Sequence, residues 1–298
     1  MSDDVSPIPP TLEPFVASDG TRIAVHRFVP PVAEVRGAIV SLHGIQSHAG
    51  WYRESSQRLA AAGWEVWSID RRGSGVSGGS RGHAPHWERL VNDVVQMLNH
   101  VRTRNVAGPV VLQGVSWGGK LAAAVARLHP RLIDALALVY PGIHARIRPS
   151  LRQRLLLGLA DVFGARRRPV LLPLEDAALF TNNLERQRFL REDPLSLRTA
   201  TTGFLIADRE LTRLAQSAGP DLRVPTLLIL AGRDRIIDTP AMRRYFESIA
   251  TRDKTLVEFS EATHTLEFDA CFEEFVKALR GWLGRQTKNP GVQPRGFE

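Results

Sequence analysis

Cysteine is almost missing from this sequence of 298 residues, in which Cys271 is the single one. One cysteine cannot form an internal disulfide, and it is too few for a zinc or iron–sulfur site built on thiolates. Met1 to Pro14 is acidic and proline-rich and lacks the basic and apolar regions of a secretory signal. No apolar run reaches the length of about 18 residues that a membrane span needs. These absences predict a soluble, cytoplasmic protein.

Sequence patterns for cofactors and nucleic acids are missing as well. There is no glycine-rich dinucleotide motif, no Walker pattern and no His, Asp or Glu cluster at metal-ligand spacing, so we expect no cofactor and no metal. The net charge is +8, but many of the arginines lie among leucines between residues 143 and 219, without a helix-turn-helix or RNA-recognition motif. Nucleic acid is therefore not an expected partner.

Short apolar, β-branched runs alternate with longer helical patterns along most of the chain. Near-continuous apolar runs of this length are typical of strands covered on both faces, and the alternation predicts an α/β fold with a mostly parallel, doubly wound sheet. Asp19-Gly20, between Phe15–Ser18 and Arg22–Phe28, predicts a two-residue hairpin. The expected strands of the parallel sheet are Ala38–Leu42, Glu65–Ile69, Val110–Leu112, Ala135–Val139, Thr226–Leu230 and Lys254–Glu258, and helices are expected at Arg53–Ala62, Trp87–Arg102, Trp117–His129 and Pro240–Ser248.

The alternation stops between Val139 and Pro225, where the sequence shows helical patterns and no convincing strand. We interpret residues 143–219 as a helical cap or lid inserted into a core formed by residues 1–142 and 220–284, and residues 285–298 as a disordered tail. One lid helix, within Arg148–Phe163, places Leu151, Leu155, Leu159 and Val162 on one face, flanked by arginines. That stripe either packs against the core or contacts lipid at a membrane surface.

The sharpest motif is Gly114-Val115-Ser116-Trp117-Gly118, which matches G-x-S-x-G between a predicted strand and a predicted helix. This context is that of a nucleophile elbow, a turn so sharp that the flanking positions need glycine. Ser116 is therefore the candidate nucleophile. A serine needs a base, and His264, just after the last predicted strand, is the candidate. Asp234, after the strand before it, is the favoured acid, with Asp238 left open as an alternative that could instead cap the following helix.

Two backbone N–H groups should bind the oxyanion of an acyl-transfer intermediate. Those of Trp117 and Ile45 are the candidates, because one follows the nucleophile and the other lies in the loop after Ala38–Leu42. Gly44 gives that loop freedom to turn its amide. His43 and His48 are expected to hold it by hydrogen bonds.

Taken together, these residues resemble the monoacylglycerol lipase and lysophospholipase-like branch of the α/β hydrolases, also grouped as serine aminopeptidase S33-like. The resemblance covers roughly residues 15 to 283. It rests on His43-Gly44, on the run Asp70-Arg71-Arg72-Gly73-Ser74-Gly75-Val76-Ser77-Gly78 with Arg81-Gly82, on the Ser116 elbow, on the Asp234 and His264 loops and, more weakly, on Asp193-Pro194-Leu195. Two departures concern the acyl pocket. Trp117 stands where the family usually has a small residue or Met, and Ile45-Gln46-Ser47-His48 replaces its usual G-x-x-x-H segment.

The resemblance implies hydrolysis of carboxylic esters, with monoacylglycerol- or lysophospholipid-like substrates, through an acyl-enzyme on Ser116 with Asp234 and His264 completing the triad. Other activities remain open on the same residues. An aminopeptidase needs acidic side chains near the lid to bind the free ammonium group of its substrate. The candidates for that role are Glu175, Asp176, Glu192 and Asp193. A thioesterase or another acyl hydrolase is a further alternative. A protein that binds ligands without catalysis would typically have lost a triad member.

Overall fold

The computed structural model describes residues 9–32, 34–104, 108–148 and 150–287. Its main feature is an eight-stranded sheet with the order β1-β2-β4-β3-β5-β6-β9-β10. From β4 onward in that order all neighbours are parallel, whereas β1 pairs with β2, and β2 with β4, in antiparallel fashion. The strands are β1 (Thr11–Val16), β2 (Arg22–Phe28), β3 (Gly37–Leu42), β4 (Trp64–Ile69), β5 (Val110–Val115), β6 (Ala135–Val139), β9 (Thr226–Ala231) and β10 (Lys254–Phe259). The predicted mostly parallel sheet is confirmed.

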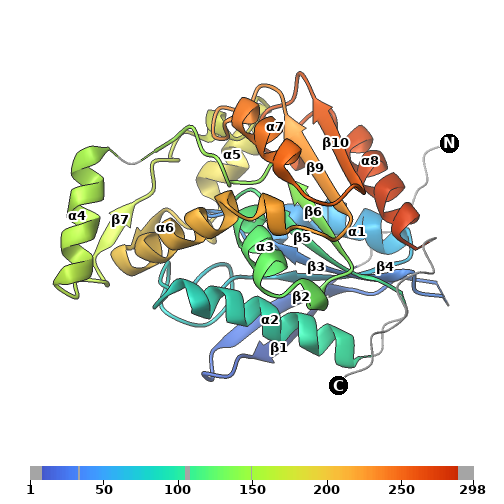
Figure 1. Cartoon of the computed structure of the whole chain (residues 1–298), viewed down its shortest axis with the longest axis horizontal. Coiled ribbons are helices and arrows are strands. Elements are labelled where there is room, and N and C mark those ends of the chain that lie inside the picture. The colour runs from blue at the N-terminus through green and yellow to red at the C-terminus, as the bar shows by residue number, and fades with distance from the viewer. Residues whose placement is uncertain (1–8, 33, 105–107, 149, 288–298) are drawn as a thin grey trace.

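Helices cover both faces of this sheet (Figure 1). Helices α1 (Arg53–Ala61) and α8 (Phe272–Gln286) contact each other on one face, and α2 (Trp87–Thr103) packs beside α3 (Trp117–Leu128) on the other. Every residue of β3, β4, β5, β6 and β9 is buried, since these strands lie between the two helical layers. The remaining core helix is α7 (Thr239–Ser248), and short 3₁₀ helices lie at Ala49–Tyr52, Pro130–Leu132, Ala177–Leu179, Gly219–Asp221 and Leu266–Phe268.

Helix α2 illustrates why the sequence forms these elements where it does. The His86 side chain accepts a hydrogen bond from the Arg89 N–H and so caps the first turn. Apolar residues then recur three or four positions apart, which places them on one face of the helix. That face is buried against the sheet, and its residues are Leu90, Val91, Val94, Met97, Leu98 and Val101.

The segment between β6 and β9 contains α4 (Leu151–Val162), α5 (Leu184–Glu192) and α6 (Thr202–Gln216), as well as two strands, β7 (Pro169–Leu171) and β8 (Thr199–Thr201). The expectation of no strand here is wrong, because β7 and β8 pair in antiparallel fashion. Each is three residues long, too short to show an alternation in sequence. Helix α6 packs against α3 and so anchors the segment on the sheet, while α4 lies at the far end of the molecule (Figure 1). The boundaries at residues 143 and 219, and a role as a lid, stay predictions.

Two local expectations need correction. The hairpin at Asp19-Gly20 is longer than two residues, since the Ala17 N–H bonds the Thr21 carbonyl and the Gly20 N–H bonds the Ala17 carbonyl, which leaves three residues in the loop. Gly20, at φ +80°, ends that loop in the left-handed region. The predicted disordered tail begins too early, because α8 continues to Gln286. Residues 288–298 of that tail lie outside the described residues.

Candidate functional site

Ser116 lies in the sharp turn between β5 and α3, at φ 51° and ψ −119°. A non-glycine residue at positive φ is strained, and here the close packing of the turn imposes it. A Cβ on Gly114 would lie 2.5 Å from the Gly118 carbonyl oxygen, and a Cβ on Gly118 would lie 2.3 Å from that of Leu42. The motif's two glycines are therefore required by space. The turn presents the Ser116 hydroxyl at the N-terminus of α3.

Ser116, His264 and Asp234 meet at the carboxyl ends of the strands. The His264 Nε2 atom is 2.9 Å from Ser116 Oγ, and its Nδ1 atom is 2.7 Å from Asp234 Oδ2. A carboxylate accepts hydrogen bonds, so Nδ1 carries the ring proton and Nε2 is left to accept from the serine hydroxyl. Asp234 is held by the N–H groups of Ile236 and Ile237, both 2.8 Å from its other oxygen. The three side chains form one continuous chain of hydrogen bonds.

Asp238, the alternative acid, lies elsewhere. Its side chain accepts a hydrogen bond from the Ala241 N–H at 3.0 Å and caps α7, and its own N–H bonds the His144 carbonyl. This is the capping role that the sequence left open for it. The structure therefore brings Asp234, and not Asp238, to the histidine.

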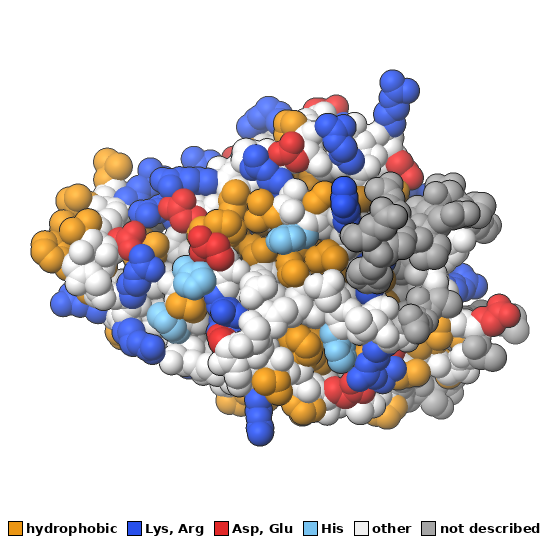
Figure 2. Space-filling view, turned by 60° about the horizontal axis from the view of Figure 1, so that its bottom comes forward, with side chains coloured by type: hydrophobic (Ala, Val, Ile, Leu, Met, Phe, Trp, Pro, Cys, Tyr) orange, Lys and Arg blue, Asp and Glu red, His pale blue; other side chains and the backbone are white. Residues whose placement is uncertain are grey.

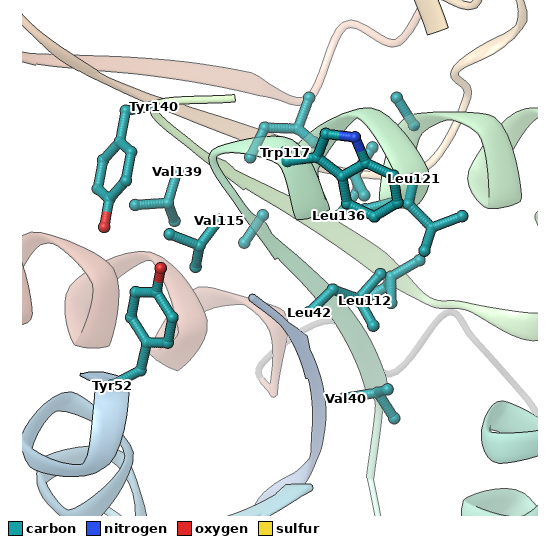
Figure 3. Packing of buried hydrophobic residues seen from close by; sticks show 14 of the residues in the cluster. Val40, Leu42, Tyr52, Leu112, Val115, Trp117, Leu121, Leu136, Val139 and Tyr140 are labelled. Atoms are coloured by element: carbon teal, nitrogen blue, oxygen red, sulfur yellow. The ribbon is translucent and has the colours of Figure 1, made fainter. Parts of the chain in front are cut away.

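A buried carboxyl group beside His264 was missed from the sequence. The Tyr140 ring packs edge-on against the His264 ring, with 4.9 Å between centroids, and the Tyr140 hydroxyl donates to Glu267 Oε2. Figure 3 shows the hydroxyl groups of Tyr52 and Tyr140 turned toward one another on this side of the sheet, with Trp117 on the other. Burial raises the pKa of Glu267 to about 7. A lone Glu between Leu266 and Phe268, three residues after the histidine, is the signal that could have revealed it.

The loop after β3 approaches the nucleophile, since a Cβ on Gly44 would lie 3.4 Å from the Ser116 Cβ. His43 Nδ1 donates to the Gly44 carbonyl at 2.7 Å, and its Nε2 accepts from the Arg71 N–H at 2.9 Å. The Gly44 carbonyl can only accept a hydrogen bond and the Arg71 N–H can only donate one. The ring is therefore neutral, with its proton on Nδ1. Burial, together with the charge of Arg71, lowers the pKa of His43 to about 3, in agreement with a neutral ring. The expectation that His43 holds this loop is confirmed.

His48 ties the same loop to the segment between β6 and β9. Its Nε2 atom lies 3.1 Å from Asp193, which also accepts from the Trp51 indole at 2.7 Å, while its Nδ1 accepts from the Gly50 N–H. Burial acts to raise the pKa of Asp193, but the hydrogen bonds from His48 and Trp51 hold it below the usual value. His48 therefore has the predicted structural role. Asp193 anchors the segment through the same contacts.

Trp117 is the second candidate donor of the oxyanion site. Its indole Nε1 donates to Asp208 Oδ1 at 2.6 Å, and the same oxygen lies 2.6 Å from Lys120 Nζ. Asp208 belongs to α6 and Lys120 to α3, so this cluster joins the helix that begins at the nucleophile to the segment above it. Neither residue was singled out from the sequence, because their pairing spans 88 positions of the chain.

Among the described residues, no group of three or more His, Cys, Asp or Glu side chains is arranged to hold a metal ion. Within the same ranges, no helix has the length and apolar character needed to cross a membrane.

Comparisons with known proteins agree with this architecture. The family model described as "Serine aminopeptidase, S33" matches residues 33–270 of the chain. A monoacylglycerol lipase of Mycolicibacterium smegmatis is 28% identical over 255 residues, a match that covers 84% of this chain and 88% of that protein. The monoglyceride lipase of Homo sapiens is 25% identical over 269 residues, covering 89% and 88% of the two chains.

Solved structures show the same fold. A monoacylglycerol lipase of Paleococcus ferrophilus superimposes with a TM-score of 0.78 and 26% identity, covering 89% of this chain and 99% of that one. A soluble variant of monoglyceride lipase from Saccharomyces cerevisiae, solved with a substrate analog, gives a TM-score of 0.81 at 18% identity, with 96% and 98% of the two chains covered. The predicted α/β-hydrolase fold and the resemblance to the monoacylglycerol lipase-like branch are confirmed.

Proposed function

The chain belongs to the serine aminopeptidase S33 family of hydrolases, and on that premise we propose that it hydrolyses carboxylic esters through an acyl-enzyme on Ser116. The observation that carries the proposal is the hydrogen-bond chain from Ser116 Oγ through His264 to Asp234, with distances of 2.9 and 2.7 Å. A serine hydroxyl is a weak nucleophile, and a base held in this position activates it.

The reaction proceeds in two steps. Ser116 Oγ attacks the ester carbonyl while His264 Nε2 takes the hydroxyl proton, and Asp234 keeps the imidazole in the required tautomer and stabilises its protonated form. The N–H groups of Ile45 and Trp117 bind the oxyanion. The C–O bond to the alcohol then breaks, and His264 returns the proton to the leaving oxygen. Water attacks the acyl-enzyme by the same route, which releases the carboxylic acid and restores the Ser116 hydroxyl.

The proposed substrates are monoacylglycerol- or lysophospholipid-like esters. The relatives named above support this class, and so does helix α4, which has no buried residue and exposes 82% of Leu151 and 80% of Val162. The alternative that this stripe packs against the core is not what the structure shows. Figure 2 shows hydrophobic side chains gathered at the α4 end of the molecule, with Lys or Arg side chains next to them.

We propose that this end of the lid contacts anionic lipid surfaces. An apolar helix flanked by cations suits the boundary between acyl chains and charged headgroups, where each basic residue contributes about 1 kcal/mol. The arginines near α4 in the sequence are Arg146, Arg148, Arg152, Arg154, Arg166, Arg167 and Arg168. Of these, Arg146 bonds the Ile237 carbonyl and Arg166 pairs with Asp161. A cytoplasmic location stays a prediction from the sequence.

An aminopeptidase activity finds less support. It would need a free carboxylate near the lid to bind the substrate ammonium, yet Asp193 is bound to His48 and Trp51, and Asp176 caps a 3₁₀ helix through the Ala178 N–H. Glu175 and Glu192 are exposed and remain candidates. Paired assays on amino-acyl and fatty-acyl reporters separate this activity from ester hydrolysis, and a fatty-acyl thioester assayed beside the matching oxygen ester separates that of a thioesterase.

The proposal is tested by replacing the nucleophile. Ser116→Ala should remove labelling by a fluorophosphonate and lower kcat on p-nitrophenyl esters by about a million-fold, as expected for the loss of a triad nucleophile. The matched control is Ser18→Ala, in the exposed β1–β2 loop, which should label and turn over like the parent protein. Esters of two to sixteen carbons define the acyl preference. Labelling that persists in Ser116→Ala would assign the nucleophile to another residue.

A further inference from the structure

Arg71 is a buried arginine with an unusual set of partners. It is 7% exposed, and the structure records no ion pair between it and any residue that it describes. Its guanidinium instead donates to two carbonyl oxygens of the loop after β3, those of Gly44 at 3.3 Å and Ile45 at 3.0 Å, and to Ser74 Oγ at 2.6 Å. The next residue, Arg72, is 6% exposed and forms a bidentate ion pair with Asp93, as is usual for a buried arginine.

Burying a charged group without a carboxylate partner costs free energy, and the pKa of Arg71 reflects that cost. Loss of water lowers the pKa of Arg71 to about 9, and the carboxylates of Asp208 and Asp70 only partly oppose this. Two aromatic rings stabilise the cation, since its central carbon lies 4.6 Å from the Trp117 ring and 4.9 Å from that of Phe204. The guanidinium therefore contacts both proposed oxyanion donors, Trp117 through its ring and Ile45 through the loop.

The contact with Gly44 has a geometric consequence. The Gly44 carbonyl and the Ile45 N–H belong to one planar trans peptide, in which the C=O and the N–H point in opposite directions. His43 at 2.7 Å and Arg71 at 3.3 Å both donate to that carbonyl, so the peptide cannot rotate without losing two hydrogen bonds. Within the part of the chain that is described, no acceptor is recorded for the Ile45 N–H. An oxyanion site needs such an N–H group, because a donor already bonded within the protein could not bind the oxyanion.

We propose that Arg71 is a positioning residue of the oxyanion site, whose guanidinium fork holds the Gly44 and Ile45 carbonyls so that the Ile45 N–H stays aimed at the reacting carbonyl. The inference rests on the proposed ester hydrolysis and adds to it a residue that touches no reacting atom. The backbone N–H of Arg71 also donates to His43 Nε2, but a substitution of the Arg71 side chain leaves that contact in place. The variants therefore report on the guanidinium alone.

The test compares Arg71→Met and Arg71→Lys with a matched control, Arg72→Met, on a p-nitrophenyl ester. Losing an oxyanion donor outright typically lowers kcat by about 10²- to 10³-fold. Because His43 still holds the Gly44 carbonyl, we expect kcat to fall roughly 10- to 100-fold in Arg71→Met. KM should change little, since the substrate ground state makes no bond to the misaligned amide. Lysine has no planar fork and cannot bridge the two carbonyls and Ser74, so Arg71→Lys should lose most of the same factor.

A second readout separates positioning from a loss of stability. A trifluoromethyl ketone adds to Ser116 and forms an oxyanion, so its inhibition constant should rise by the same factor as kcat/KM falls. Binding of a free fatty acid should stay unchanged. Arg72→Met removes an arginine of equal burial and should lower Tm but leave kcat and the ketone affinity unchanged.

Each outcome decides the proposal. A folded Arg71→Met enzyme with unchanged kcat and ketone affinity overturns the role of Arg71 and leaves the proposed activity standing, because the parent enzyme is still active. If Arg71→Met does not fold, unchanged values in Arg71→Lys overturn it in the same way. An equal loss in Arg72→Met would also overturn it, since any buried arginine would then have the same effect. If the parent chain cleaves no ester, the proposed function itself fails.

Discussion

Replacing Glu267 with glutamine removes a carboxyl group that is buried beside His264, and its effect on stability should depend on pH. Burial raises the pKa of Glu267 in the folded chain to about 7, against an ordinary value of 4.5, because the charged form has lost its water. The hydrogen bond from the Tyr140 hydroxyl favours the charged form and opposes this shift, but the loss of water outweighs it. The folded state therefore prefers the protonated acid.

The direction and size of the effect follow from this difference. Below about pH 4.5 the group is protonated in both the folded and the unfolded chain, so it adds no pH dependence. Between the two pKa values the folded chain holds a proton that the unfolded chain has released, so stability falls as the pH rises. The shift from 4.5 to about 7 corresponds to roughly 3 kcal/mol at about 1.4 kcal/mol per pH unit. The amide side chain of the Glu267→Gln variant cannot titrate, so the variant should not show this loss.

The assay is urea unfolding of the parent protein and Glu267→Gln at pH values from 4.5 to 8.5. Contributions of all other titrating groups are shared and cancel in the difference between the two free energies of unfolding. That difference should move by roughly 3 kcal/mol in favour of Glu267→Gln across the range. Glu274→Gln, at an exposed position of α8, is the matched control for the same change of side chain outside the core. If Glu267→Gln gives a constant difference, Glu267 is ionised in the folded protein and the burial argument is wrong.

Two further predictions concern the proposed acid Asp234 and the arginines of the segment between β6 and β9. Asp234→Asn should lower kcat by about 10⁴-fold, because an amide favours the wrong imidazole tautomer, whereas Asp238→Asn should cost a few-fold at most, because Asn still caps α7. The reverse ranking in steady-state assays would reassign the acid. Replacing Arg166, Arg167 and Arg168 with Ser should weaken sedimentation with anionic vesicles in a salt-dependent way and leave hydrolysis of a short soluble ester intact. Equal binding by parent and triple variant would exclude a contribution of these arginines.

Several features of the site were predictable because they depend on neighbours in the chain. The apolar runs predicted the strands of the parallel sheet to within a few residues, and G-x-S-x-G predicted the turn that presents Ser116. Asp234 and His264 were recognised because both follow the carboxyl end of a strand, and parallel strands bring those ends to one edge of the sheet. That common edge predicts that the two residues lie near each other, but not that they form a hydrogen bond.

Other features depend on contacts between distant segments. The choice between Asp234 and Asp238 needed the position of His264, 30 residues away from Asp234. The exposure of α4 and the pairing of β7 with β8 likewise required the packing of the segment between β6 and β9. An amphipathic stripe looks the same in a sequence whether a core or a lipid surface covers it.

Local patterns in the chain were enough to predict the sheet, the elbow and the set of residues that could react, because periodicity and glycine requirements depend on neighbouring residues only. The alignment and the charge of those residues depend on packing between distant segments. In the sequence, nothing distinguishes Arg71 from other charged residues. Only the fold places its guanidinium against the Gly44 and Ile45 carbonyls. In the sequence, Glu267 looks like any other acidic residue. In the fold, Tyr140 and the surrounding core exclude water from its carboxyl group. Hydrogen-bond direction and desolvation arise only when segments far apart in the chain are packed together.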